Sequence, residues 1–479
     1  MNQDNGGIIG KLNTPTTTVA SGVWTLQDQF EAQTSSIWPL AFPQTTIANS
    51  CRFDDGSSDS LNKTFGTPTN NLIWSFSAWV KRSSLGTQNI FSAYTDGNNF
   101  GMISFNSSNA LDVGSYIDGY EMRYITNRVF RDLGAFYHLC VTNDSSLASP
   151  ETKIYINGVL ETSFSTSNAP SQNEESMINK SGVAHWVGQN GNSTSYFDGY
   201  MAEVIFIDGQ ALDQTSFGAF NPVTNIWEPR GYAGTYGTNG FRLDFANSSA
   251  LGNDVSGNDN DFTVNNLTSI DQSTDTCSNN FATANPLIGN ANVEYSDGNL
   301  NSYHTYSGQW RSTISTIGAS SGKWYAEYKI SAVGTEVSVG ICDVTTITQT
   351  SANDFIGEFT DSVGYVNSGS IYKANSVAQG SLTTYTANDI IGIAMDLDNN
   401  TIQFYKNGST IGTTTSLTAN KTYAFGTAGY GDARILWNIG SPSFSISSGN
   451  ADANGHGNFE YAVPSGYFSL CTKNLAEFG

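Results

Sequence analysis

Between about residues 44 and 232, short apolar stretches alternate with turn-forming residues at close spacing. The segment Trp74–Val80 alternates apolar and polar positions and then becomes continuously apolar, which predicts a buried strand. Further strands are predicted at His138–Thr142, Lys153–Leu160 and Phe197–Ile207. The pair Asn157-Gly158 supplies the two left-handed residues of a type I′ hairpin turn. These strand lengths and turn signals predict an antiparallel β-sandwich.

A second pattern of the same kind begins near residue 291. Like 153–160, the segment 401–411 has a strand, Asn-Gly and a second strand, so two related sandwiches in tandem are predicted. We expect the first at 44–267, where Phe241–Phe245 is a further strand, a linker at 268–290, and the second at 291–479. The strands predicted for the second sandwich are Ser321–Ile330, Val337–Ile341, Val363–Tyr365, Asp389–Asp396, Thr401–Gly408, Tyr423–Phe425 and Arg434–Gly440.

Residues 1–43 differ from the rest and contain a single helix signal. Thr25 and Asp28 form a capping-box pattern, with Asp in place of the usual Glu or Gln. A helix of about ten residues is not stable alone, so its apolar face needs a surface to dock on. That surface is either a partner protein, which we favour, or the chain's own sandwich. The predicted docking residues are Val23, Trp24, Leu26, Phe30 and Trp38.

Composition narrows the function classes. The 479 residues carry a formal net charge of −22, and only 13% of them are charged. An acidic chain is repelled by a phosphate backbone, so no nucleic-acid partner is expected. No apolar run reaches the length of a membrane span, and the first ten residues lack the regions of a secretory signal, so no membrane partner is expected either.

The five cysteines are widely spaced, odd in number and include no C-x-x-C pair. A zinc site or a dense disulfide framework is therefore not expected. Cys140 and Cys342 lie inside apolar strand patterns, so we expect them to be small buried side chains.

The sequence offers no catalytic constellation. Glycosidases of a sandwich fold need two carboxylates about 5 Å apart on one face, and no strand has the required alternation. Asp396 and Asp398 come nearest, but they lead into a tight turn, where aspartate bonds to the backbone. The four histidines are dispersed, and His138 lies on an apolar strand. We therefore predict that the chain is not an enzyme.

Two kinds of binding residue remain. Calcium prefers several oxygen ligands from loops. The candidate ligands are Asp254, Asn258, Asp259 and Asp261 in residues 233–290, which we call the connector, with Asp54, Asp55 and Asp59 as a second group. Solvated turn residues are the alternative for both groups. Exposed aromatic rings can stack on sugars, and the candidates are Tyr116, Tyr120, Tyr124, Tyr365 and Tyr372. Core packing is the alternative for each ring.

Two segments resemble known domain families. The order "WSFSAWVKR", "FYHLCVTNDSS…TKIYINGVL" and "YFDGYMAEVIFIDGQAL" resembles the laminin-G-like branch of the concanavalin A-like jelly rolls. The order "GKWYAE", "VGI", "DIIGIAMDLDNNTIQFYKNG" and a late Trp-Asn-x-Gly strand resembles the SPRY domain. Both resemblances imply concanavalin A-like sandwiches. The first family includes sugar binders, protein binders and inert spacers, and the second is a binding scaffold without catalytic residues.

The whole layout resembles virion proteins of tailed bacteriophages. This rests on the block "GGIIGKLNTPT…ASGVWTLQDQFEA…WP", which looks like an anchoring segment ahead of fibre-type modules. The resemblance implies a structural protein on the particle surface, such as a tail fibre, with other virion proteins bound through residues 1–43 and host surface polysaccharide as ligand. It also implies a homo-oligomer, a trimer by analogy. A head or tail decoration protein without a ligand and a polysaccharide depolymerase are the alternatives.

Overall fold

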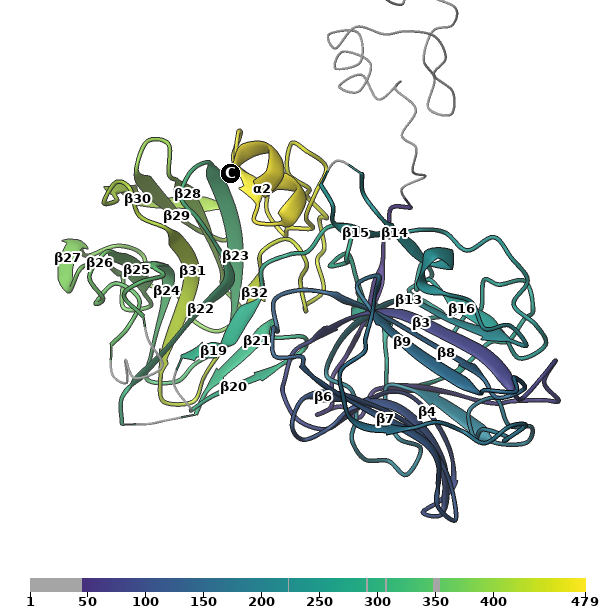
Figure 1. Cartoon of the computed structure of the whole chain (residues 1–479). Coiled ribbons are helices and arrows are strands. Elements are labelled where there is room, and N and C mark those ends of the chain that lie inside the picture. Colours follow the sequence, from purple (N-terminus) through teal and green to yellow (C-terminus); the bar gives the residue numbers. More distant parts are fainter. Residues whose placement is uncertain (1–44, 223, 290–291, 306–307, 348–353) are drawn as a thin grey trace, which may run out of the picture. The chain divides into compact units, whose positions relative to one another are not determined.

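The computed structural model describes residues 45–222, 224–289, 292–305, 308–347 and 354–479. Regular structure in these residues is almost entirely β-strand in antiparallel sheets (Figure 1), which confirms the predicted fold class. Two compact units are present. One comprises Ile47–Gln214 with Ala233–Gly479 and contains both sandwiches, and the other comprises residues 45–46 with Thr215–Tyr232. The predicted docking helix lies outside the described residues.

The first sandwich is built from strands before residue 274. They are β1 Ser50–Phe53, β2 Ser60–Thr64, β3 Ile73–Arg82, β4 Gln88–Asp96, β5 Asn99–Phe105, β6 Ala110–Ile117, β7 Tyr120–Val129, β8 Tyr137–Asp144, β9 Glu151–Ile156, β10 Val159–Leu160, β11 Phe164–Asn168, β12 Ala184–Val187, β13 Gly199–Asp208, β16 Phe241–Leu243, β17 Thr263–Asn265 and β18 Gln272–Ser273.

These strands form two eight-stranded sheets. One has the order β10-β9-β8-β3-β13-β1-β18, with β16 added on β13, and the other has the order β11-β7-β6-β5-β4-β12-β2-β17. The connector after residue 232 thus contributes strands to both sheets. A core of buried apolar side chains lies between them. The ring of Phe91 contacts those of Phe76 and Phe206 there, and burial of each such ring contributes roughly 2 kcal/mol.

The second sandwich repeats this architecture after residue 283. Its strands are β19 Ala284–Gly289, β20 Val293–Ser296, β21 Asn301–His304, β22 Trp310–Ala319, β23 Lys323–Val333, β24 Glu336–Asp343, β25 Ser362–Val366, β26 Ser370–Lys373, β27 Ser376–Gln379, β28 Ile390–Asp396, β29 Thr401–Lys406, β30 Ser409–Ser416, β31 Tyr423–Tyr430, β32 Ala433–Asn438 and β33 Phe468–Ser469, followed by the helix α2 at Thr472–Phe478.

The sheets of the second sandwich have the orders β19-β22-β31-β24-β25-β26-β27 and β20-β21-β32-β23-β28-β29-β30, with β33 parallel to β23. A separate apolar core fills the space between them. The sequence pattern did not predict α2, because a helix of seven residues is too short to show a clear apolar period. The small unit contains the hairpin of β14 (Gly218–Phe220) and β15 (Trp227–Pro229).

Both predicted Asn-Gly hairpins are present. Asn157 and Gly158 join β9 to β10 with φ angles of 47° and 78°, and Asn407 and Gly408 join β29 to β30 with φ angles of 49° and 77°. Left-handed backbone at both central residues is the signature of a type I′ turn. The shared hairpin therefore has the same local cause in both sandwiches.

The segment predicted as a linker is tightly bonded within the large unit. Lys81 on β3 forms an ion pair with Asp275 at 2.8 Å, and both side chains are 1% exposed. The same ammonium group donates to the side chain of Asn280 and to the carbonyl of Phe281. Because a buried ion pair needs such additional bonds to offset its desolvation, these contacts fix segment 275–281 on the first sandwich.

Candidate binding face of the first sandwich

Four aromatic side chains lie side by side across neighbouring strands. The register pairs Tyr94 on β4 with Phe100 on β5, Phe100 with Tyr116 on β6, and Tyr116 with Tyr120 on β7. All four are partly exposed. Directly paired residues share one face of a sheet, so these residues form a continuous strip, which we call the aromatic row.

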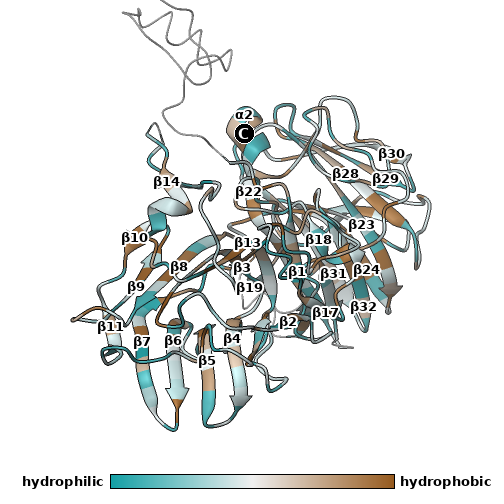
Figure 2. Cartoon of the chain, turned by 90° about the vertical axis from the view of Figure 1, so that its right-hand side faces the viewer, coloured by the Kyte–Doolittle hydropathy of each residue, from teal (hydrophilic) through white to brown (hydrophobic). Residues whose placement is uncertain are grey.

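The aromatic row lies on the outer face of its sheet. Ile103, three positions after Phe100, belongs to the buried core. Val113, three positions before Tyr116, belongs to it as well. Side chains alternate between the faces of a strand, so the core residues and the aromatic row point in opposite directions. Figure 2 shows β4, β5, β6 and β7 next to one another in this sheet.

Ring contacts hold three members of the row, Phe100, Tyr116 and Tyr120, in a fixed arrangement. Phe100 stacks on Tyr116 with ring centroids 5.0 Å apart, and Tyr120 meets Tyr116 edge-to-face at 4.9 Å. The guanidinium of Arg123 lies 4.3 Å from the ring centre of Tyr120 and pairs with Asp112 at 2.8 Å. Aromatic and cation–π contacts of this kind each contribute about 1 kcal/mol, so the rings are preorganised for a ligand.

A pocket of about 240 Å³ opens beside one end of the row. Tyr94, Phe100, Asn89, Asn190 and Asn192 contribute to its lining. The Oδ1 atom of Asn89 is buried and has no hydrogen-bond partner among the described residues. An unpaired buried acceptor is costly, and a ligand hydroxyl or amide that reaches it removes this cost.

Gly191 allows the pocket wall to approach the aromatic residues. Its φ angle is +55°, and a Cβ atom at this position would lie 2.4 Å from the Cβ of Tyr94 and 3.0 Å from the indole of Trp186. Any larger residue would therefore displace both rings. Apolar rings beside a few amide groups are the usual composition of a small-molecule site.

Not all of the predicted sugar-binding tyrosines lie on this face. Tyr116 and Tyr120 belong to the aromatic row, but Tyr124 is 7% exposed and belongs to the core. In the second sandwich Tyr365 is fully buried, and Tyr372 packs edge-to-face against Phe355. The burial of Tyr124 and Tyr365 corrects the prediction for these two, because each points to the inner face of its sheet and offers a ligand no surface.

The predicted calcium ligands of the connector bond to their own loop instead. The carboxylate of Asp254 accepts hydrogen bonds from the backbone N–H groups of Arg242, Ser256 and Asn260. Asp261 accepts from the N–H of Asp254. The side chain of Asn258 donates to the carbonyls of Gly237 and Gly240, and Asp259 is exposed with φ 56°. No metal-compatible cluster is found among these four within the described residues, because their side chains stabilise a turn-rich loop.

The predicted docking residues Val23, Trp24, Leu26, Phe30 and Trp38 lie outside the described residues. The rejected catalytic candidates have structural roles. Asp396 pairs with Lys323 at 2.9 Å, and Asp398 accepts the N–H of Gly322. His138 is fully buried against Ser77, and burial lowers its pKa to about 3. The cysteines are free, and Cys140 and Cys342 are buried, as predicted.

Sequence reasoning missed Asn89, Tyr94, Phe100 and Asn190. A signal was present for one strand pairing of the row, that of β6 with β7: Asp118-Gly119 is a typical two-residue hairpin sequence, and Asp118 has φ 52°. Such a turn places Tyr120 near Tyr116. No local sequence pattern predicts that Asn190 lines the pocket. Its loop follows β12, which lies beside the row only because β12 pairs with β4 in the sheet.

Comparison with known proteins agrees with this architecture. A family model described as the concanavalin A-like lectin/glucanases superfamily matches residues 55–216, and a model described as the SPRY domain matches residues 323–433. Both resemblances read from the sequence are thereby confirmed, and both domain types indicate a binding or adaptor role. None of the matches indicates a bacteriophage origin. No curated protein matches the chain.

Solved structures similar to the chain include SPRY domains. The SPRY domain of human HERC1 has 17% sequence identity and a TM-score of 0.26, over 32% of this chain and 96% of that domain. The TRIM65 PSpry domain has 15% identity and a TM-score of 0.28, over 33% and 89%. In the part of the chain that the structure describes, no helix has the length and apolar character needed to cross a membrane.

Proposed function

We propose that the chain is a non-catalytic carbohydrate-binding protein whose first sandwich receives a polysaccharide on the aromatic row. The observation that carries this proposal is the alignment of four partly exposed rings across four strands. Adjacent strands are about 4.8 Å apart, so the row spans roughly 14 Å. A strip of this length suits several consecutive sugar units better than a single one.

The proposed contacts follow from the chemistry of sugars. The apolar face of a sugar ring can lie on Tyr94, Phe100 or Tyr116, while its hydroxyls reach the amides of Asn190 and Asn192. Asp112 is neutralised by Arg123, and the chain as a whole carries −22. A strongly acidic protein repels polyanions, so we expect a neutral polysaccharide as ligand.

A hydrolytic role is not part of the proposal. Glycosidases need a carboxyl pair about 5 to 9.5 Å apart on either side of the scissile bond. Asp112, the carboxylate beside Tyr120, is held by two bonds from Arg123 instead. Incubation with a bound polysaccharide should therefore release no reducing ends, and their release would favour a depolymerase.

The first experiment measures binding of the full chain to immobilised neutral and acidic polysaccharides. Replacing Tyr116 with Ala removes the central ring and should weaken binding about tenfold, which corresponds to about 1.4 kcal/mol. Tyr303→Ala is the matched control, since Tyr303 is also a half-exposed tyrosine under an arginine, with Arg434 4.0 Å from its ring centre. Equal losses in the two variants, or no binding to any polysaccharide, would overturn the proposal.

We propose a tailed-bacteriophage particle as the setting of this binding, with the chain as a tail-fibre or receptor-binding subunit attached through residues 1–43. Support comes from the N-terminal block and from two binding modules that follow it. Deletion of residues 1–43 should abolish incorporation into the particle and leave polysaccharide binding intact. Normal incorporation of the truncated chain would contradict the attachment, and normal particles with a chain that binds no glycan would favour a decoration protein.

A further inference from the structure

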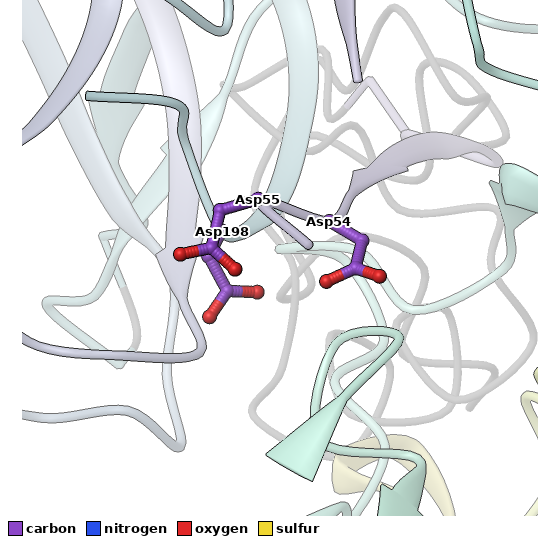
Figure 3. Close-up of side chains that lie close together, drawn as sticks. All are labelled: Asp54, Asp55 and Asp198. Carbon is purple, nitrogen blue, oxygen red and sulfur yellow. The ribbon is translucent and has the colours of Figure 1, made fainter. Parts of the chain in front are cut away.

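Three aspartates converge where β1 ends and β13 begins. The register pairs Phe53 with Gly199, so the next residue of β1, Asp54, lies opposite Asp198. Asp55 follows in the same turn. Oxygen atoms from the three carboxylates lie within 4.8 Å of one another (Figure 3). We call Asp54, Asp55 and Asp198 the carboxylate cluster.

Asp198 is the unusual member, because it is a buried carboxylate that forms no ion pair among the described residues. It is 6% exposed, and its Oδ1 atom has no hydrogen-bond partner among the described residues. The guanidinium of the adjacent Arg82 is committed to neutral acceptors, including the carbonyls of Phe130 and Gly86. The nearby Ser84 hydroxyl only partly opposes the effect of burial, which together with the charges of Asp55 and Asp54 raises the pKa of Asp198 to about 8.

The backbone holds the cluster in place from both sides. The N–H of Asp54 donates to the carboxylate of Asp59 at 3.0 Å, and the N–H of Asp59 donates back to the carbonyl of Asp54. On the other strand, Gly199 has φ +142°, and a Cβ atom there would lie 2.1 Å from the carbonyl oxygen of Lys81. The fold therefore fixes the backbone on which Asp54 and Asp198 face each other.

The surroundings add negative charge and leave one side open. Asp297, in the turn between β20 and β21, is close enough to raise the pKa of Asp54. None of the three carboxylates forms an ion pair in the part of the chain that the structure describes. Asp54 is half-buried and Asp55 is exposed, so an ion can enter from solvent and keep water ligands.

We propose that Asp54, Asp55 and Asp198 bind one divalent cation, and that calcium is the ion that fits. Calcium–oxygen bonds of 2.3–2.6 Å place opposite ligands about 4.6–5.2 Å apart, which agrees with the spacing of the cluster. Calcium accepts six to eight oxygens in flexible geometry, so waters can complete the shell on the open side. Magnesium needs shorter bonds in near-ideal octahedral geometry and fits less well. The bound ion ties the end of β1 to the start of β13 and neutralises Asp198.

The test is a calcium titration of the full chain after treatment with EDTA, followed by heat of binding and by thermal unfolding. We expect one calcium per chain and a midpoint that rises by several degrees, with a weaker response to magnesium. Asp198→Asn should fold and lose at least tenfold in calcium affinity. Asp55→Asn, at an exposed position where misfolding is not a concern, should also weaken binding about tenfold.

Asp259→Asn is the matched control, because it changes an exposed aspartate of the connector loop that lies outside the cluster. It should leave calcium affinity and the calcium-dependent midpoint unchanged. The proposal is overturned if calcium gives neither heat nor a midpoint shift with the parent chain, or if Asp198→Asn and Asp55→Asn bind calcium as tightly as the parent. Polysaccharide binding is not a readout here, so this result is independent of the proposed function.

Discussion

Each sandwich buries a carboxylate, Asp198 in the first and Glu327 in the second, and the two meet opposite surroundings. Glu327 is fully buried and accepts hydrogen bonds from the backbone N–H groups of Glu460 and Tyr461, both at 2.8 Å, and from the hydroxyl of Tyr325. Asp198 faces two further carboxylates, and its Oδ1 atom has no hydrogen-bond partner among the described residues. The second sandwich thus satisfies Glu327 with its own donors, whereas Asp198 keeps an oxygen that an outside ligand could use.

The tyrosines show the same contrast. In the second sandwich, the hydroxyl of Tyr365 donates to the carbonyl of Thr383, and its ring is buried beside that of Tyr385. In the first sandwich, Tyr116 and Tyr120 keep part of their rings in solvent. Polar groups without a partner and exposed aromatic rings are features of ligand sites. The first sandwich has both, so it is the better candidate for ligand binding.

The largest loss of stability is expected from replacing Glu327, the buried acceptor of the second sandwich. Glu327→Ala leaves the buried hydroxyl of Tyr325 and two partly buried backbone N–H groups without their acceptor. An unpaired buried group costs about 1–3 kcal/mol, so the loss of stability should be about 3 kcal/mol. Asp198→Ala removes a carboxyl whose Oδ1 atom has no hydrogen-bond partner among the described residues, so it should cost little in calcium-free buffer. Urea unfolding followed by tryptophan fluorescence measures both, and similar losses for the two variants would contradict the contrast.

A pH titration sharpens the same comparison. Burial and neighbouring acids raise the pKa of Asp198 from 3.8 to about 8, and burial raises that of Glu327 from 4.5 to about 7. A carboxyl whose pKa is higher in the folded state binds its proton more tightly there. Stability is therefore greatest below pH 4 for this contribution and falls as pH rises toward 8.

The upper part of that fall, between about pH 7 and 8, comes mainly from Asp198, because Glu327 has lost more than half of its proton by then. Asp198→Asn should flatten it, and calcium should suppress it in the parent chain because the ion stabilises the charged form. The unfolding midpoint in EDTA and in calcium, measured from pH 4 to 8, checks both statements. A midpoint that rises with pH in EDTA would contradict the assignment.

The aromatic row can be perturbed without touching its rings. Gly191→Ala places a methyl group against Tyr94 and Trp186 and imposes a strained φ of +55°, which should cost about 1–2 kcal/mol of stability. Displacement of Tyr94 should also weaken polysaccharide binding severalfold. Gly86→Ala is the control, because Gly86 has positive φ but no atoms near its Cβ position. If both variants keep full binding, the pocket wall does not contribute to the site.

The strands and hairpins could be predicted because their causes are local. Alternation along Trp74–Val80 became β3, and Asn157-Gly158 and Asn407-Gly408 became type I′ turns. The sites could not be predicted in the same way. Asp54 and Asp198 lie 144 positions apart in the sequence, and only the β1–β13 register brings them together.

The misassigned residues have a related cause. A tyrosine beside a polar loop gives no sign of which face its strand will bury, and a shift of one position reverses the answer. Tyr116 and Tyr124 illustrate this, since both lie in the same polar stretch but one is on the outer face and the other in the core. Acidic loops are equally ambiguous: the connector's Asp254 bonds to backbone N–H groups, while Asp198, followed by glycine, does not.

The smallest effects should come from the feature that the two sandwiches share. Asn157→Ala and Asn407→Ala each place an alanine in left-handed backbone, which should lower stability by about 1 kcal/mol. Each also removes a side-chain acceptor, for the N–H of His138 in one hairpin and of Ile390 in the other. Asn407 additionally donates to Asp389, so its replacement should cost slightly more.

Glycine at either position relieves the backbone strain and should recover part of the lost stability, measured as the midpoint of thermal unfolding. If alanine and glycine lower stability equally, the side-chain hydrogen bonds rather than the turn geometry hold these hairpins. The Asn-Gly signal that the two sandwiches share then rests on side-chain bonding and not on left-handed backbone.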